Sequence, residues 1–311
     1  GAIVGYQGPS FAGHSASVPP SGPKPESKLW FNDGFWWGYL WDSGSNDFHI
    51  FKLNTTTQVW SDTGVAGDTR ANTTADVLWD GTKLYVASHA QSDSNQNAAA
   101  AQLYRYSYNA STDAYSLDAG FPAQINNITT ETLVLAKDST GQLWATWQQD
   151  GATNADNRIM LNTTICSPVC NDAAWGTPFA LSTEAVADDD ISSIIAFGGN
   201  KIGVMWSNQT SNAMRFAVHN DADADTVWTT ETATSGSGIA DDHINLKTDA
   251  SGRVYAATKT STDPLNRLLV RDPAGTTPWT AHNFGTNAEN HTRPIVLLDL
   301  ANGLIRMFAT V

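Results

Sequence analysis

The chain has 311 residues, enough for one large β domain or for two ordinary domains. Hydrophobic residues make up 41% of it and include 12 Trp, whereas charged residues make up only 15%, a balance that suits a strand-and-turn protein with a sizeable core. The formal net charge of −14, with only 17 Lys and Arg, argues against a nucleic-acid partner and against an acidic membrane surface, because both need clustered positive charge.

The N-terminal region divides into two parts. Residues 2–11 (AIVGYQGPSF) include a short apolar run, and residues 12–27 (AGHSASVPPSGPKPES) are rich in Pro, Gly and Ser, which predicts an irregular arm. The start of the chain lacks the charged and apolar regions of a signal peptide, and no apolar run approaches the roughly 20 residues that a membrane-spanning helix needs. We therefore expect a soluble, processed product without a membrane span.

From residue 29 onward, one pattern of two short strands around an Asp, Gly or Asn turn recurs. Its six copies are residues 29–42, 77–89, 133–148, 193–207, 244–260 and 295–310. Their spacing of roughly 50 to 60 residues is typical of the blades of a β-propeller.

A second two-stranded unit follows each of the first five copies, with an aromatic residue near the start of its later strand. These units are residues 51–65, 104–120, 159–181, 215–233 and 270–284. Two hairpins give four antiparallel strands, which make one blade. The pattern predicts an all-β fold: a single β-propeller domain over residues 1–311 with six four-stranded blades, or seven blades in a longer parent.

The sixth copy has no second unit after it. Residues 2–11 could supply an outer strand to that blade, which would close the ring and remove two exposed sheet edges. We expect the propeller to be closed by this N-terminal segment.

The cysteines and the sequons both indicate whether the protein is located inside or outside the cell. Cys166 and Cys170 lie in a turn-like segment without nearby His, so a zinc site would lack ligands and a local disulfide is favoured over free thiols. Seven N-x-S/T sequons, which would make the chain a glycoprotein, fall in segments expected to be turns: Asn54, Asn72, Asn109, Asn127, Asn162, Asn208 and Asn290. We expect an extracellular protein, secreted or on the cell surface.

Two resemblances add to this reading. HTRPIVLLDLANGLIRMFAT (residues 291–310) resembles the first-blade segment of sialidase-like propellers, and the resemblance implies that Arg293 would hold a substrate carboxylate. The chain departs from sialidases in lacking their S-x-D-x-G-x-T-W boxes. Residues 27–310 resemble propeller modules of large secreted bacterial proteins, on segments such as SKLWFND, WDGTKLYVASH and KIGVMWSNQ. That resemblance implies a secreted propeller, with other domains of a larger surface protein as partners, and implies no activity.

The repeat places ionisable residues at one equivalent position. Loops that enter the innermost strand of each blade share a face with loops that leave the second strand, and propeller ligand sites usually lie on that face. Ten residues before the turns at Gly141, Asn200, Gly252 and Gly303 stand Glu131, Asp190, Asp242 and Arg293. His243 follows Asp242, and His291 lies near Arg293. We expect these groups at a polar channel mouth.

The ends of the second strands should reach the same face. The equivalent residues there are all polar: Asp42, His89, Gln148, Ser207, Lys259 and Thr310. Two separate positions thus predict one polar mouth, although solvated loop ends are polar in proteins without a site there.

The expected ligand of this mouth is a polysaccharide or other glycan, and its mixed charges favour an acidic one. Whether the protein is an enzyme stays open. In a glycoside hydrolase, Glu131, Asp190 and Asp242 would divide the roles of general acid and of base or nucleophile. In a polysaccharide lyase, Arg293 or Lys259 would neutralise a uronate while His89, His243 or His291 took the adjacent proton.

A binding or surface-assembly module without catalysis is the competing class. It would use Arg293, His291, His89, Lys259, Asp42 and Gln148 as ligand-binding residues. Trp41, Trp147 and Trp206 could stack on sugar rings, but packing between blades is the favoured interpretation.

A metal is the last candidate ligand. Asp188 and Asp189 could bind Ca²⁺ with further oxygens from Glu131 or Asp242. The alternative is a protein without any cofactor.

Overall fold

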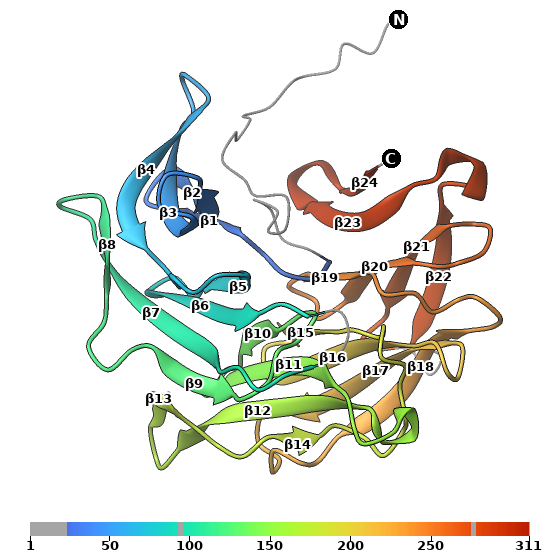
Figure 1. Ribbon diagram of the computed structural model, residues 1–311. Coiled ribbons are helices and arrows are strands. Elements are labelled where there is room, and N and C mark those ends of the chain that lie inside the picture. Colours follow the sequence, from blue (N-terminus) through green and yellow to red (C-terminus); the bar gives the residue numbers. More distant parts are fainter. Residues whose placement is uncertain (1–23, 93–95, 275–277, 311) are drawn as a thin grey trace, which may run out of the picture.

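The computed structural model describes residues 24–92, 96–274 and 278–310. These residues form antiparallel strands in six sheets, joined by turns and by three short 3-10 helices at Asn154–Asp156, Asn287–Glu289 and Leu300–Asn302. Figure 1 shows the sheets following one another in chain order, from β1–β4 in blue to β23–β24 in red.

Each predicted hairpin forms the first two strands of one sheet. These pairs are β1 (Leu29–Asn32) and β2 (Phe35–Asp42); β5 (Thr73–Trp79) and β6 (Lys83–Ala90); β10 (Val134–Lys137) and β11 (Leu143–Gln149); β15 (Ser192–Phe197) and β16 (Lys201–Asn208); β19 (Ile244–Thr248) and β20 (Val254–Lys259); and β23 (Thr292–Asp299) and β24 (Leu304–Thr310). Their turns carry glycines with positive φ at equivalent places, such as Gly34, Gly141 and Gly252, a conformation that glycine adopts without strain.

The predicted second units supply the outer strands of the first five sheets. They are β3 (Asp47–Asn54) and β4 (Val59–Ala66); β7 (Ala101–Asn109) and β8 (Ala114–Leu117); β12 (Arg158–Cys166) and β13 (Cys170–Trp175); β17 (Ala213–Asn220) and β18 (Thr229–Ser235); and β21 (Asn266–Arg271) and β22 (Trp279–Phe284). Two short strands add to this pattern: β9 (Ala123–Asn126) pairs with β7, and β14 (Phe179–Ala180) pairs with β12.

The core of the molecule lies between consecutive sheets. Five buried apolar clusters in the described residues each join two sheets that follow one another in the chain. The first contains Trp37 and Tyr39 from the first sheet with Leu84 and Tyr106 from the second. Because an inner sheet is covered on both faces, strands such as β16 are buried almost throughout.

The tryptophans near the ends of the second strands belong to these clusters. Trp41 is 5% exposed, and Trp147 and Trp206 are fully buried. Large aromatic side chains fill the space between neighbouring sheets, so packing is the role of all three, and stacking on a sugar is not.

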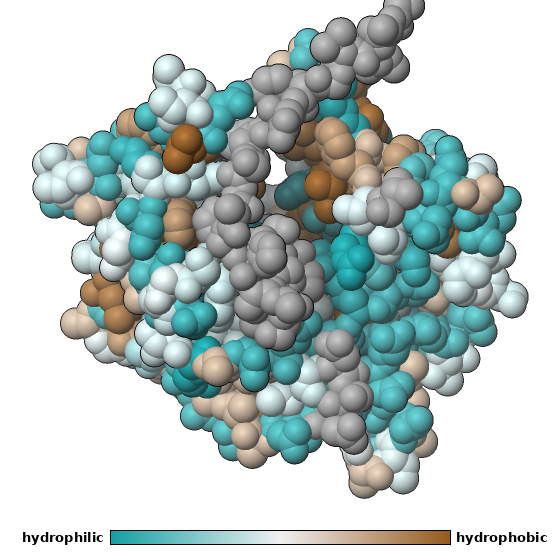
Figure 2. Space-filling view, turned by 45° about the horizontal axis from the view of Figure 1, so that its top comes forward, coloured by the Kyte–Doolittle hydropathy of each residue, from teal (hydrophilic) through white to brown (hydrophobic). Residues whose placement is uncertain are grey.

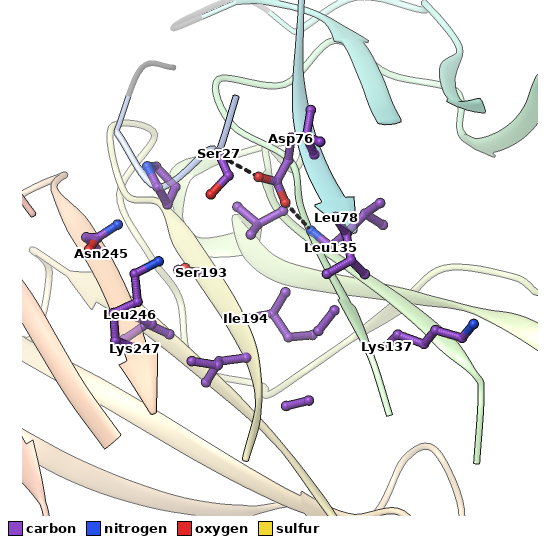
Figure 3. A pocket seen from close by; sticks show the side chains of 16 residues that line it. Ser27, Asp76, Leu78, Leu135, Lys137, Ser193, Ile194, Asn245, Leu246 and Lys247 are labelled. Atoms are coloured by element: carbon purple, nitrogen blue, oxygen red, sulfur yellow. Dashed lines mark hydrogen bonds between the residues drawn. The ribbon is translucent and has the colours of Figure 1, made fainter. Parts of the chain in front are cut away.

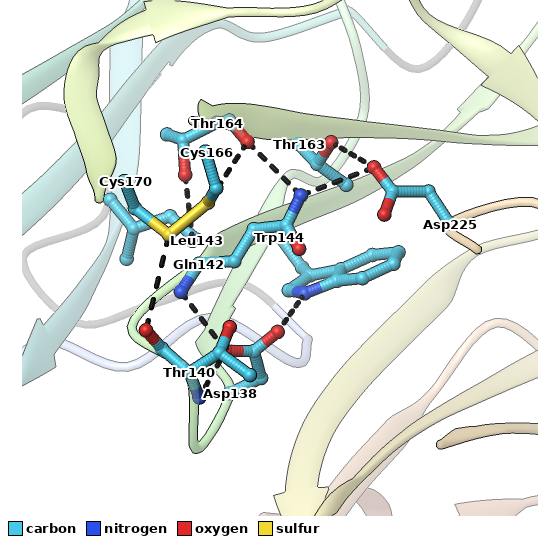
Figure 4. Close-up of a disulfide and its surroundings, with 10 residues drawn as sticks. All are labelled: Asp138, Thr140, Gln142, Leu143, Trp144, Thr163, Thr164, Cys166, Cys170 and Asp225. Atoms are coloured by element: carbon cyan, nitrogen blue, oxygen red, sulfur yellow. Dashed lines mark hydrogen bonds between the residues drawn. A yellow bond between two sulfur atoms is a disulfide. The ribbon is translucent and has the colours of Figure 1, made fainter. Parts of the chain in front are cut away.

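The predicted disulfide is present. Cys166 and Cys170 are bonded and stand opposite each other across the hairpin of β12 and β13 (Figure 4). Beside it, Gln142 donates a hydrogen bond to the carbonyl of Thr164 and one to Asp225, which connects this hairpin to the turn of the next sheet.

Four of the seven sequons lie in strands, contrary to the prediction of turns: Asn54 and Asn109 are exposed residues that end β3 and β7, whereas Asn162 and Asn208 are buried. Asn162 is inside β12 and buried, and its amide donates to the carbonyls of Ile125 and Gly176 at 2.7 and 3.1 Å. Asn208 ends β16, is also buried, and donates to the carbonyl of Ala185. Neither amide nitrogen is accessible for glycosylation in the folded protein.

The sixth sheet has two strands among the described residues, β23 and β24. Val296 packs against the fifth sheet, whereas Ile295, Leu297 and Phe308 are exposed. Hydrophobic side chains lie beside the central hollow in the space-filling view (Figure 2). Residues 2–11, which we expect to close the ring, lie outside the described residues, and so does most of the predicted arm.

Candidate functional site

Four inner strands line a central cavity of about 280 Å³. They are β5, β10, β15 and β19, from the second to the fifth sheet, and the side chains of Leu135, Ile194 and Leu246 give the cavity an apolar wall (Figure 3). Pro25 and Ser27 also line it, so the segment just before β1 reaches the cavity.

The segment 24–28 inserts charged side chains at this place. Glu26 and Lys28 are buried. The carboxylate of Glu26 lies 2.6 Å from His89 Nε2 and accepts the backbone N–H of Leu133, while Lys28 donates to Thr74. Burial raises the pKa of Glu26, but the charges of His89 and Lys28 outweigh burial and hold that pKa below its usual value.

Three carboxylates from three sheets meet at the amino ends of the inner strands. Glu131, Asp189 and Asp242 each place an oxygen within 4.8 Å of the others, and we call this group the carboxylate cluster. Lys24 donates hydrogen bonds from its ammonium group to Glu131 and Asp242. The cluster therefore holds three acids and one cation; Glu131, Asp242 and Lys24 are largely buried, whereas Asp189 is exposed.

Asp242 belongs to a second group with Asp241, His243 and Lys259. His243 Nδ1 lies 2.8 Å from Asp242 Oδ1 and 3.3 Å from Asp241 Oδ1, and Lys259 donates to Asp241 at 2.8 Å. Burial lowers the pKa of His243, but the two carboxylates outweigh it and raise that pKa. Burial raises the pKa of Asp242, yet hydrogen bonds and the Lys24 charge hold it well below its usual range.

The three consecutive aspartates that precede β15 lie in different surroundings. Asp188 and Asp189 are both exposed, Asp189 joins the carboxylate cluster, and Asp190 is fully buried in its own loop. The carboxylate of Asp190 accepts the backbone N–H groups of Ala187 and Gln209. Burial raises the pKa of Asp190 to about 6 against these hydrogen bonds. Asp190, one of the predicted catalytic residues, thus stabilises a loop, and its neighbour Asp189 faces the cluster.

The predicted ligand-binding residues lie in different surroundings. His89 is fully buried against Glu26 and Thr130. Gln148 is buried and donates to Asp150. Asp42 is the last residue of β2, and Ser45 in the following turn donates to it through both its backbone N–H and its hydroxyl group.

The sixth sheet carries the remaining two predicted residues. Arg293 is exposed, has a φ of 51° at an irregularity in the pairing of β23 with β24, and makes no ion pair with any described residue. His291 stacks on Phe284 and stays 3.9 Å from Glu289. These two are not members of the carboxylate cluster.

Lys24, Glu26 and Asp76 are site residues that the sequence analysis did not single out. Lys24 stands ten residues before the turn glycine Gly34, the same offset that selected Glu131 and Asp242, so extending the count to the first hairpin would have found it. Asp76 is a lone acid inside an inner strand, buried beside the cavity. Acidic residues are unusual inside buried strands, so Asp76 could have been singled out from the sequence on that ground.

Chemically, the cluster can accept hydrogen bonds from hydroxyl or ammonium groups. Burial raises the pKa of Asp189, whereas that of Asp242 is lowered, so neighbouring carboxylates differ in their readiness to hold a proton. Glu131, Asp189 and Asp242 also offer oxygen ligands to a cation, which fits the part of the metal prediction that named Asp189. Asp188 is not part of that set.

No protein-family model and no curated protein sequence matches the chain. Among solved structures, it is similar to an α-L-arabinanase of Penicillium chrysogenum in complex with arabinobiose, with a TM-score of 0.51 and 12% identity over 85% of this chain and 80% of that one. It is also similar to an α-L-arabinofuranosidase of Fusarium graminearum, with a TM-score of 0.52 and 9% identity over 88% of this chain and 83% of that one. The fold is a β-propeller.

The six sheets are therefore the blades of a propeller, as the repeat predicts. A specific relation to sialidases stays a prediction. Among the described residues there is no helix of the length and apolarity needed to cross a membrane.

Proposed function

We propose that this propeller binds carbohydrate at the carboxylate cluster. The observation that carries the proposal is the convergence of Glu131, Asp189 and Asp242, which come from the loops that precede β10, β15 and β19, three of the strands that line the central cavity. Carboxylates are strong acceptors for sugar hydroxyl groups, and a concave site with a few converging polar groups is the usual form of a ligand site. The two structural neighbours with the same fold act on arabinose-containing substrates according to their names, which is consistent with the proposal.

The charges of the site favour a sugar without carboxylate groups. Lys24 is paired with Glu131 and Asp242, and Lys259 is paired with Asp241, so the nearby ammonium groups already have partners. A uronate would place another negative charge beside three acids. An acidic polysaccharide, favoured from the sequence, is thus the less suitable class, and it remains in the test below.

Hydrolysis is a second candidate function, supported by the opposite pKa shifts of two cluster members. Asp189, with a raised pKa, would donate a proton to the leaving oxygen, and ionised Asp242 would act as nucleophile or base. A lyase reaction through His243 is less well supported, because two carboxylates favour its protonated form and a protonated imidazole cannot take a proton. A location outside the cell is the setting we propose, and the disulfide is consistent with it.

Calorimetric titration with matched neutral and uronic-acid oligosaccharides tests the binding proposal. We expect a neutral oligosaccharide to bind, and Glu131→Gln and Asp242→Asn each to weaken it about tenfold or more, the effect of one charged hydrogen bond. Asp223→Asn, on the turn between β17 and β18, is the matched control and should bind as the wild type does. Absence of binding by every oligosaccharide, or wild-type affinity in both variants, refutes the proposal.

The same oligosaccharides test hydrolysis. If the protein is a hydrolase, the wild type releases new reducing ends from the oligosaccharide that it binds. Asp189→Asn should then slow this release by about 100-fold or more while binding persists. Binding without any new reducing end identifies a binding module.

A further inference from the structure

The carboxylate cluster holds a cation in this structure, and the chain itself supplies it. The Lys24 ammonium group contacts Glu131 Oε1 and Asp242 Oδ2. The three side chains are only 13%, 6% and 15% exposed, so these charges are largely removed from water. Such a pair is stable only while each charge has a partner.

Lys24 does not satisfy the cluster completely. Glu131 is 5% exposed, and its second oxygen, Oε2, is buried and accepts no hydrogen bond from any described residue. The third carboxylate, Asp189, has an oxygen within reach of the other two acids; Lys24 does not bond to it, and Asp189 Oδ2 accepts one hydrogen bond from Gln209 at 3.2 Å. An ammonium group has three donors, and Lys24 uses two of them on this cluster. A cationic donor placed more centrally would find acceptors that Lys24 leaves free.

We propose that the ligand of this site carries a primary ammonium group, and that Lys24 occupies the place of that group until the ligand binds. The inference rests on the proposed carbohydrate function and names its class: an amino sugar with a free amine, such as glucosamine units in a de-N-acetylated polysaccharide.

A free amine matches the donor and acceptor count better than a divalent metal does. Ca²⁺ takes six to eight oxygen ligands, and because one oxygen of each acid converges at this site, the rest of that set would have to come from second carboxylate oxygens or from water. An ammonium group needs three acceptors and finds one on each of Glu131, Asp189 and Asp242.

Lys24 can also leave without loss of the fold. Two residues later, Glu26 anchors the chain to His89, and Ser27 donates its backbone N–H to Asp76 at 2.6 Å. Lys24 lies before these anchors, and rotation about its long side chain withdraws the ammonium while both contacts persist.

The test compares tetramers of glucosamine and of N-acetylglucosamine, which have the same backbone and differ in the free amine. Titration at pH 6.5 is made with the wild type, Lys24→Met and the control Lys201→Met. We expect Lys24→Met to bind the free amine at least about tenfold more tightly than the wild type does, because the competing ammonium is gone. Lys201→Met, distant from the cluster, should behave as the wild type, and the gain in Lys24→Met should be confined to the tetramer with the free amine.

A second variant gives a readout that does not depend on the folding of Lys24→Met. Glu131→Gln removes one negative charge and keeps Lys24, so we expect the preference for the free amine to fall about tenfold.

Equal affinity for both tetramers, or the same preference in the wild type and in both variants, overturns this inference and leaves carbohydrate binding standing. Stabilisation of Lys24→Met by calcium chloride but not by the free amine assigns a metal instead and also overturns it. Failure of every oligosaccharide class to bind overturns the inference together with the proposed function.

Discussion

Asp76 shows how the fold sets the chemistry of a single side chain. It lies in the inner strand β5, is buried beside the central cavity, and accepts the backbone N–H groups of Ser27 and Leu135 at 2.6 and 2.9 Å (Figure 3). Burial raises the pKa of Asp76 to about 7, although the two hydrogen bonds work against it. One carboxyl group thereby connects the segment before β1 to the second and third blades.

This raised pKa predicts a pH-dependent stability. In the unfolded chain Asp76 titrates near pH 4, and in the folded chain near pH 7, so between these values the folded state holds a proton that the unfolded state has lost. By linkage, the contribution of Asp76 to the free energy of unfolding falls as the pH rises through this window. Asp76→Asn should cost about 1–3 kcal/mol, because one amide oxygen must serve two N–H groups, and should remove this dependence.

Urea unfolding at several pH values between about 4 and 8 checks the point. The free-energy advantage of the wild type over Asp76→Asn should shrink as the pH rises. A constant difference across the range would show that Asp76 keeps an ordinary pKa.

At the scale of elements, β16 shows how tightly the blades are packed. Gly203 lies in the middle of this strand, and a Cβ atom there would stand 2.2 Å from Cζ of Phe216 on the neighbouring strand β17. Both positions belong to the fourth blade, where Phe216 also packs edge to face on Trp279 of the fifth blade. The space taken by the ring explains the glycine in a strand whose neighbours are buried and apolar.

Gly203→Ala should therefore be destabilising, by about 1–3 kcal/mol, because the added methyl group forces Phe216 and its neighbours to move. Phe216→Leu provides the matched partner for a double-mutant cycle, since a shorter side chain makes room for the methyl group. We expect the double variant to be more stable than the sum of the two single effects predicts. Additive losses, measured by thermal or urea unfolding, would mean that the two residues do not compete for space.

The whole molecule has an apolar face at each end of its series of blades. In the first blade, Trp30 and Trp37 pack against the second blade, while Leu29, Phe31 and Trp36 are exposed. The sixth blade likewise exposes three large apolar side chains: Ile295, Leu297 and Phe308. Apolar patches of this kind on a soluble protein are usually covered by another surface.

We predict that residues 2–11 help to close the ring at these faces by pairing with the sixth blade. Val4→Asp, or deletion of residues 2–11, should then lower the melting temperature by a few degrees and increase binding of an apolar dye. Ser15→Asp, in the predicted arm, is the control and should have no effect. An unchanged melting temperature in both the deletion and Val4→Asp would contradict closure by this segment.

The fold was largely predictable from the sequence because its information is local and repeated. Hairpin turns, alternating apolar residues and a regular spacing specify strands and blades without knowledge of distant contacts, and the predicted pairs recur as β1–β2 through β23–β24. The short disulfide was predictable for the same reason, since its two cysteines stand on one hairpin. The position ten residues before each hairpin turn also identified Glu131 and Asp242 as candidate site residues.

Only the tertiary structure decided which charges meet. Adjacent residues on one loop point to different surroundings, so Asp189 reaches the carboxylate cluster while Asp190 turns inward to bind backbone N–H groups. Lys24 and Glu131 are 107 positions apart in the chain and come together because the segment 24–28 lies against the inner strands. Sequence periodicity determines which blade end a residue occupies, whereas side-chain direction and burial, which set its pKa and its partners, arise only when the blades surround a common axis.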